Sequence, residues 1–384
     1  MEIATTILIY TSVLGFILGY VVNKTNFCTM GAVSDLVNIG DSSRLKAWFL
    51  AITVAILGVT FLVYTGTLNA NDSRIHYSNS VFFWPRYIIG GVMFGIGMTL
   101  ASGCGNKILI RIGGGNIKSV FVLVIAGFMA LLMTRTDFYG LLFHSWMSTI
   151  SPDLAKIGIS DQSIQTIIAS LIGLDNSSIF ISLIVPLLIC GILLKYIFSS
   201  NKKLSNDNLL SGIVVGLVVT FAWLLTGGDL GQSWIENNDF LDTPYPAVGV
   251  QSFTFINPMG ETLLFTSNIF DNFFLTFGVA ALLSTIAGSF VYSILSNNLR
   301  IEWFANGHDF FRHMIGGILI GIGGVLSLGC TIGQGVSGVS TLAIGSVITL
   351  ISIIFGASLM MKIEYYKAVY DDSSFIELLK NSLI

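Results

Sequence analysis

Apolar residues in this chain fall in runs of about 18 to 22 residues, and the charged residues lie mostly between those runs. A helix of that length spans the roughly 30 Å hydrocarbon core of a bilayer and satisfies its own backbone hydrogen bonds. The pattern therefore predicts an all-α polytopic membrane protein with about nine transmembrane helices. These spans are expected near residues 3–22, 46–66, 82–103, 117–135, 178–197, 209–226, 271–294, 312–330 and 342–361.

Composition supports a membrane protein. Hydrophobic residues make up 53% of the chain and charged residues only 10%, whereas an average soluble domain is about 25% charged. The net charge of −3 and the scattered Lys and Arg provide no basic face with interleaved aromatics, so nucleic acid is not expected as a partner. The first apolar run lacks a basic leader and a small-residue cleavage site, which favours a retained helix over a signal peptide.

The distribution of Lys and Arg predicts the orientation in the membrane. With the N-terminus outside, 14 of the 18 basic residues fall on the inner side, which favours a cytoplasmic C-terminus under the positive-inside rule. Four tryptophans near span ends are expected to anchor the helices at the membrane interfaces: Trp48, Trp84, Trp146 and Trp303.

Two parts of the chain repeat each other. The segment from Arg86 to Cys104 matches the segment from Arg312 to Cys330 at 10 of 19 positions without a gap. In the predicted span order the two segments enter the membrane from opposite faces, so we expect an inverted pseudo-two-fold repeat with re-entrant Gly/Cys loops. A single membrane domain, 1–384, is predicted, with repeat halves 1–135 and 209–361, an outer loop and connecting helix over 136–208, and a cytosolic tail over 362–384.

Three loops combine a cysteine with glycines and small polar residues. They read NFCTMG around Cys28, SGCGNK around Cys104 and LGCTIGQG around Cys330. Glycines that adopt positive φ let successive N–H groups hold an anion, and a thiol adds a soft, polarizable group. An anion with an exposed sulfur atom would use both. The supporting loop residues are expected to be Asn26, Thr29, Gly31, Gly103, Gly105, Asn106, Gly329, Thr331, Gly333 and Gln334.

The remaining candidate groups are less informative. The cysteines form no Cys-x-x-Cys pair and have no nearby His, so neither a metal site nor a cofactor is predicted, and Cys190 is expected to be dispensable. Lys107 and Arg111 could guide an anion, but basic residues between adjacent spans also satisfy the positive-inside bias without any ligand.

These motifs resemble the YeeE/YedE family of sulfur-compound transporters, and the resemblance covers nearly the whole chain. It implies uptake of thiosulfate across the bacterial inner membrane by a transporter rather than an enzyme. The family's essential cysteines then fall on Cys28, Cys104 and Cys330. The resemblance also implies a small cytosolic sulfur carrier of the TusA type as a partner.

Our mechanistic hypothesis is a relay of transient S–H···S contacts among these three cysteines, with backbone N–H groups holding the oxyanion end. A bare dianion costs tens of kcal/mol to bring into a low-dielectric medium, so thiols alone would not suffice. A membrane thiol-disulfide enzyme and a passive anion channel are the alternative functions. Neither the driving force nor the choice between thiosulfate and related sulfur or selenium compounds follows from the residues.

Overall fold

The computed structural model describes residues 2–173, 179–199 and 204–369, and over these residues it consists of helices and loops. Nine helices in this part of the chain are long and apolar enough to cross a membrane, which confirms the prediction. The long helices are α1 (Glu2–Thr25), α3 (Ser43–Tyr64), α4 (Trp84–Leu100), α6 (Ile117–Arg135), α9 (Ile179–Phe198), α10 (Asn206–Gly227), α13 (Phe277–Leu295), α14 (Gly307–Leu326) and α15 (Ile344–Val369).

Shorter helices connect the spans. They are α2 (Thr29–Ser34), α5 (Gly105–Gly113), α7 (Ser145–Met147), α8 (Ile164–Ile172), α11 (Asp229–Asp239) and α12 (Ile256–Ser267), together with the π-helical segment η6 (Gly333–Gly338). Helix α15 continues to Val369, past the predicted start of the tail at residue 362. The rest of the predicted cytosolic tail, 370–384, lies outside the described residues, as do Lys202 and Lys203 of the predicted inner side.

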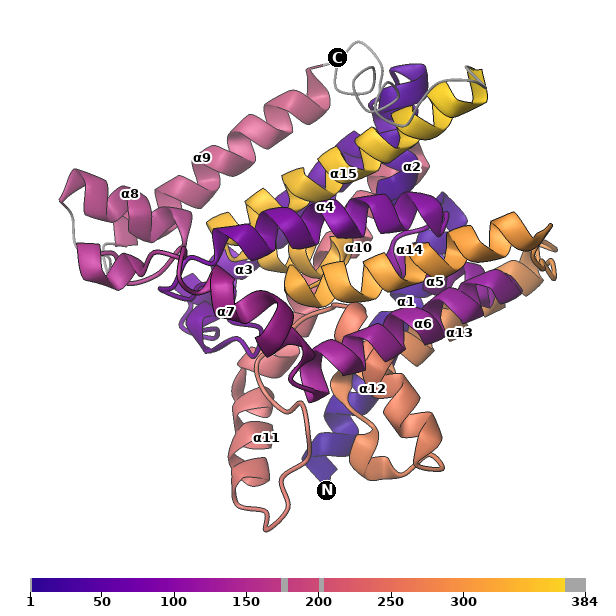
Figure 1. The fold of residues 1–384 in the computed structure, drawn as a ribbon. Helices are drawn as coiled ribbons and strands as arrows, with labels where there is room; N and C mark the ends of the chain where they lie inside the picture. Colours follow the sequence, from indigo (N-terminus) through magenta and orange to yellow (C-terminus); the bar gives the residue numbers. More distant parts are fainter. Residues whose placement is uncertain (1, 174–178, 200–203, 370–384) are drawn as a thin grey trace.

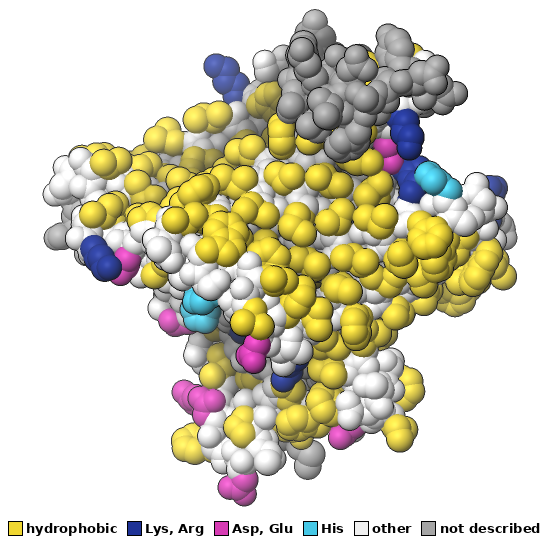
Figure 2. Space-filling model, viewed as in Figure 1, with side chains coloured by type: hydrophobic (Ala, Val, Ile, Leu, Met, Phe, Trp, Pro, Cys, Tyr) yellow, Lys and Arg dark blue, Asp and Glu magenta, His cyan; other side chains and the backbone are white. Residues whose placement is uncertain are grey.

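The surface matches a protein that faces lipid. Large apolar side chains are exposed in mid-helix, among them Ile9 on α1, Phe128 on α6 and Phe355 on α15. Figure 2 shows hydrophobic side chains over most of the visible middle of the molecule, with Asp and Glu gathered at the end that carries α11. Soluble monomers rarely expose contiguous apolar surface of this extent.

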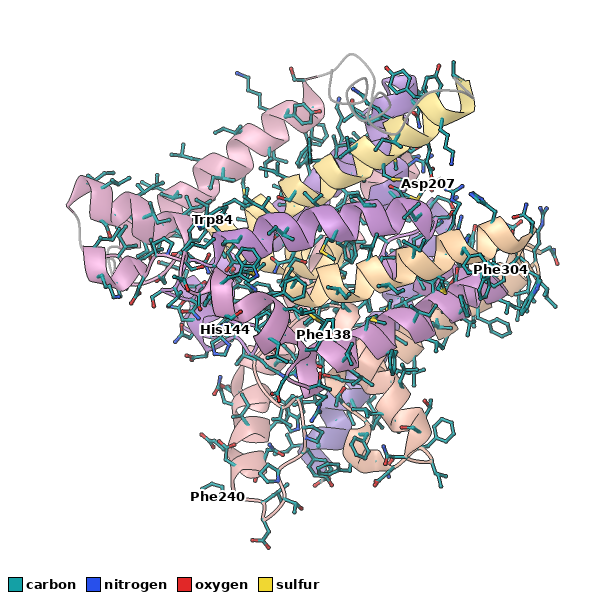
Figure 3. The ribbon with its side chains drawn as sticks, in the orientation of Figure 1. Trp84, Phe138, His144, Asp207, Phe240 and Phe304 are labelled. Carbon is teal, nitrogen blue, oxygen red and sulfur yellow. The ribbon has the colours of Figure 1, made fainter. Side chains whose placement is uncertain are left out.

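Helices α4 and α14 cross in close backbone contact and run in opposite directions (Figures 1 and 3). A Cβ added to Gly90 would lie 2.9 Å from the carbonyl oxygen of Gly323, and one added to Gly97 would lie 2.9 Å from that of Gly316. The repeat alignment matches Gly90 with Gly316 and Gly97 with Gly323. If each residue is replaced by its match in the other copy, the Gly90–Gly323 contact becomes the Gly316–Gly97 contact. This equivalence supports the inverted repeat, which remains a prediction.

The segment between α10 and α13 is folded and packs into the protein. It contains α11 and α12, and residues 250–256 between them run through the protein interior, where Phe253 and Phe255 are fully buried. Helix α12 packs on α6, with Gly127 against the backbone of Met259. This segment therefore forms part of the wall around the cysteine loops described next.

Candidate substrate site at three helix breaks

Each of the three predicted cysteine loops is a short break between two helices with the same backbone signature. The residue two positions before each cysteine has a positive φ: 52° at Asn26, 56° at Ser102 and 66° at Leu328. Helical structure resumes directly after Cys28, Cys104 and Cys330. Only about four residues per loop are irregular. The apolar residues that follow, such as Ile108 and Leu109, are helical and buried within the protein.

The glycines of these loops serve a different purpose from the one expected. Positive φ occurs at Asn26, Ser102 and Leu328 and at none of Gly31, Gly103, Gly105, Gly329 and Gly333, so the expectation of left-handed glycines is wrong. Gly105 and Gly333 are instead required for space. A Cβ on Gly105 would lie 3.2 Å from the Cβ of Cys330, and one on Gly333 would lie 2.4 Å from Oγ1 of Thr254.

The cysteine sulfurs lie at the N-terminal ends of the helices that follow. Cys28 Sγ accepts a hydrogen bond from the backbone N–H of Gly31, and Cys330 Sγ accepts one from Gly333, both at 3.4 Å. Cys104 is the N-cap of α5, and its side chain interacts with the backbone N–H of Lys107. Unpaired N–H groups and the helix dipole make such positions favourable for negative charge.

The three cysteines meet in the interior although they are far apart in the sequence. The side chains of Cys28 and Cys104 lie close enough to interact, and Sγ of Cys330 lies beside Gly105, the residue after Cys104. Their exposed fractions are 4%, 1% and 0%, and all are free thiols. Cys190 lies instead on α9, where its Sγ is 3.8 Å from the carbonyl oxygen of Thr53 on α3.

Several of the supporting loop residues carry buried polar atoms without a hydrogen-bond partner. Nε2 of Gln334 donates to the carbonyl of Ser327 at 2.6 Å, but its Oε1 is unpaired. The same is true of Oδ1 of Asn106 and of the hydroxyls of Thr29 and Thr331. Buried polar groups in native structures are nearly always satisfied, so a cluster of unpaired ones indicates a place for a ligand or ordered water.

Lys107 and Arg111, one turn apart on α5, have different surroundings. The ammonium group of Lys107 interacts with Cys28 and lies 3.5 Å from Oδ1 of Asn26. The positive charge of Arg111 instead acts electrostatically on His313, which is paired with Asp309 on α14. The structure therefore brings Lys107 to the cysteines and places Arg111 nearer the N-terminal end of α14.

Two features of the site were missed in the sequence. Trp48 was expected at a membrane interface, but it is 3% exposed and stacks on Phe27 next to Cys28, with ring centroids 4.8 Å apart. The backbone of Phe255 contacts the sulfur of Cys330 from the segment that precedes α12. No feature of the neighbouring sequence indicates either contact, because both depend on which segments meet in space.

The other three tryptophans, Trp84, Trp146 and Trp303, are exposed by 38%, 43% and 66%, as interfacial residues would be.

A pocket of about 450 Å³ approaches the cysteines from the side where α4 begins. Its lining includes Arg74, His76 and Arg86, and it reaches Leu328, two residues before Cys330. Arg74 is paired with Glu261, whereas Nε of Arg86 donates to the carbonyl of Leu326 at the end of α14. Nearby Tyr77 donates its hydroxyl to the carbonyl of Gly333, and burial raises the pKa of this tyrosine above its ordinary value.

Comparisons with known proteins show which family the sequence resembles. The thiosulfate transporter TsuA of Escherichia coli (strain K12) is 25% identical over 331 residues, covering 84% of each chain. The transporter of the same name from Spirochaeta thermophila (strain ATCC 700085 / DSM 6578 / Z-1203) is 24% identical over 376 residues, covering 91% of this chain and 97% of the relative. Residues 24–359, which include all three breaks, match the sulphur transport family. The chain is therefore a multi-pass membrane transport protein that belongs to the sulphur transport family.

Proposed function

We propose that the protein takes up thiosulfate across the bacterial inner membrane, along a path that passes the three helix breaks. The observation that carries the proposal is the convergence of Cys28, Cys104 and Cys330, each at the N-terminal end of a helix and each buried. Two relatives that match most of the chain are named thiosulfate transporters. In the membrane, the N-terminus lies outside and the C-terminus in the cytoplasm.

The anion enters through the pocket lined by Arg74 and Arg86. Bringing a bare dianion into a low-dielectric interior costs tens of kcal/mol, so positive charge and N–H donors must replace its water. The guanidinium of Arg86 has a carbonyl partner at Leu326 but no described carboxylate partner, and its charge remains available to an anion. From this pocket the anion reaches Cys330 past Leu328.

At the breaks, the terminal sulfur of thiosulfate passes among the three thiols through S–H···S contacts. Backbone N–H groups that precede or follow each cysteine hold the oxyanion end, because the unpaired side-chain atoms of Asn106 and Gln334 are amide oxygens, which accept hydrogen bonds and do not donate them. Each contact is weak, so the anion leaves as readily as it enters, which a conducting path requires. A persulfide route would need a reductant to restore each thiol, and the relay needs none.

Uptake of labelled thiosulfate by proteoliposomes tests the proposal, with sulfate, sulfite and selenium analogues as competitors. We expect saturable uptake that thiosulfate itself inhibits most strongly. Absence of uptake by correctly inserted protein would exclude thiosulfate as the substrate. Current recordings in the same liposomes distinguish a carrier from a passive channel.

The contact between Cys28 and Cys104 is the observation that would favour a thiol-disulfide enzyme. A Cys28–Cys104 disulfide that turns over with a quinone would support that function instead of transport. A TusA-like sulfur carrier is the proposed cytosolic partner, and it rests on the family resemblance. Its docking at the C-terminal tail concerns residues 370–384, which lie outside the described part of the chain.

Lys107→Gln is expected to lower the initial rate of thiosulfate uptake by about three- to tenfold. The ammonium group lies 3.5 Å from Oδ1 of Asn26, two residues before Cys28, and raises the local concentration of an anion beside the cysteines. Arg111→Gln, on the same helix but directed toward His313, should leave the rate within about twofold, because local steering falls off with distance. Initial rates at low and high salt provide the measurement, and equal losses in the two variants would contradict the assignment.

A further inference from the structure

Two threonine hydroxyls at the cysteine cluster have an unusual environment. Thr29 and Thr331 each follow a cysteine directly and begin the helix after the break. Their exposed fractions are 2% and 0%, and neither Oγ1 makes a well-formed hydrogen bond. Both side chains nevertheless interact with the same side chain, that of Cys104, which belongs to the third break.

Buried threonines elsewhere in the protein show why these two differ. A threonine inside a helix satisfies its hydroxyl by donating to the carbonyl four residues earlier. Thr29 and Thr331 have no such carbonyl available, because the chain leaves helical geometry at Asn26 and Leu328. The carbonyl four residues before Thr331, that of Ser327, already accepts from Gln334. Buried threonines that do make the internal bond are Thr53, Thr99, Thr226, Thr262 and Thr285.

An unpaired hydroxyl alone would not identify a site, since Thr11 and Thr349 also lack partners. The distinguishing feature is that Thr29 and Thr331 come from two different breaks and approach one sulfur atom. Cys104 therefore has Cys28 and two hydroxyl donors around it. An anionic sulfur that arrives there meets donors from all three loops.

We infer that Thr29 and Thr331 form a hydroxyl pair that binds the terminal sulfur of the transported anion while that sulfur lies against Cys104. The inference rests on the proposed function and assigns these residues, which the sequence indicated only as supporting loop residues, to the sulfur end of the substrate. The pair replaces part of the water that the anionic sulfur loses on entering the protein. Because both donors belong to breaks that meet only in the folded protein, binding at Cys104 requires all three loops to be assembled.

Thr29→Val and Thr331→Val test the inference, because valine keeps the shape and removes the hydroxyl. Each should raise the KM for labelled thiosulfate in proteoliposomes by about three- to tenfold, the factor expected for one hydrogen bond of ordinary strength. Thr29→Ser and Thr331→Ser keep the donor and should restore a KM within about twofold of the unsubstituted protein. Thr53→Val, whose hydroxyl bonds within α3, is the matched control.

The outcomes separate this inference from the proposed function. If the unsubstituted protein takes up no thiosulfate, the proposed function fails. If it does, and the valine variants retain its KM, the hydroxyl pair has no role in binding. Thr29→Ala and Thr331→Ala provide the same comparison if a valine variant does not insert. Serine variants as impaired as the valine variants would indicate packing by the methyl group and would also overturn the inference.

Discussion

Replacing Cys104 with serine is expected to lower thiosulfate uptake by about 100-fold, equivalent to roughly 2.7 kcal/mol. The sulfur of Cys104 contacts Cys28 and lies among the side chains of Thr29 and Thr331, so it occupies the centre of the cluster. A serine hydroxyl is smaller and much less polarizable than a thiol, and it binds water and neighbouring oxygens in preference to a sulfur atom. Initial uptake rates in proteoliposomes, normalised to inserted protein, measure the effect.

Cys190→Ser is the control for this prediction. Cys190 is also a buried thiol in a membrane-spanning helix, but it packs against the backbone of Thr53, away from the three breaks. Its substitution should change the uptake rate by less than about twofold. If serine at positions 28, 104 and 330 left uptake at the rate of the unsubstituted protein, the proposed relay would be wrong.

Adding one methyl group at Gly19 is expected to destabilise the folded protein by at least about 3 kcal/mol. A Cβ on Gly19 would lie 2.0 Å from the carbonyl oxygen of Thr285, and one on Gly288 would lie 2.0 Å from that of Phe16. Helices α1 and α13 would have to separate, and both support the site, since α1 leads to Cys28 and α13 packs on α5. The yield of monodisperse Gly19→Ala protein in detergent and its melting temperature measure the loss.

Gly191→Ala introduces the same methyl group where no atom lies within 4 Å. Alanine is favoured over glycine in a helix interior by about 1 kcal/mol, so this variant should be as stable as the unsubstituted protein or more stable. The two substitutions are therefore expected to have opposite signs. A melting temperature of Gly19→Ala equal to that of Gly191→Ala would show that α1 and α13 are not in close contact.

Local sequence was most informative where one physical constraint acts on consecutive residues. The apolar runs predicted all nine spans, with ends that differ from the observed helices by up to 8 residues, as at Val369 of α15 against the predicted 361. A helix is the structure in which one segment satisfies all its own backbone groups in lipid. The glycines that the repeat matches, among them Gly90 and Gly316, lie at close helix contacts, where small residues at regular spacing let backbones approach.

Local sequence was less informative about the role of each loop residue. The motifs identified the three cysteines, but glycine was expected at the positive-φ positions that Asn26, Ser102 and Leu328 occupy. Gly105 and Gly333 are instead placed where a neighbouring segment leaves little room for a side chain. Whether a glycine provides conformational freedom or space depends on what lies next to it, and its own sequence context does not contain that information.

By itself, then, the sequence determined the membrane class, the nine spans and the three cysteine motifs of the candidate site. Only the tertiary structure decided that these cysteines lie together, that Trp48 and the segment 250–256 help to enclose them, and that Lys107 rather than Arg111 faces them. Hydrophobic length and local motifs act along the chain, and they can be read from it. Contacts between residues 28, 104 and 330 depend on how helices distant in sequence pack against one another, which no single segment specifies.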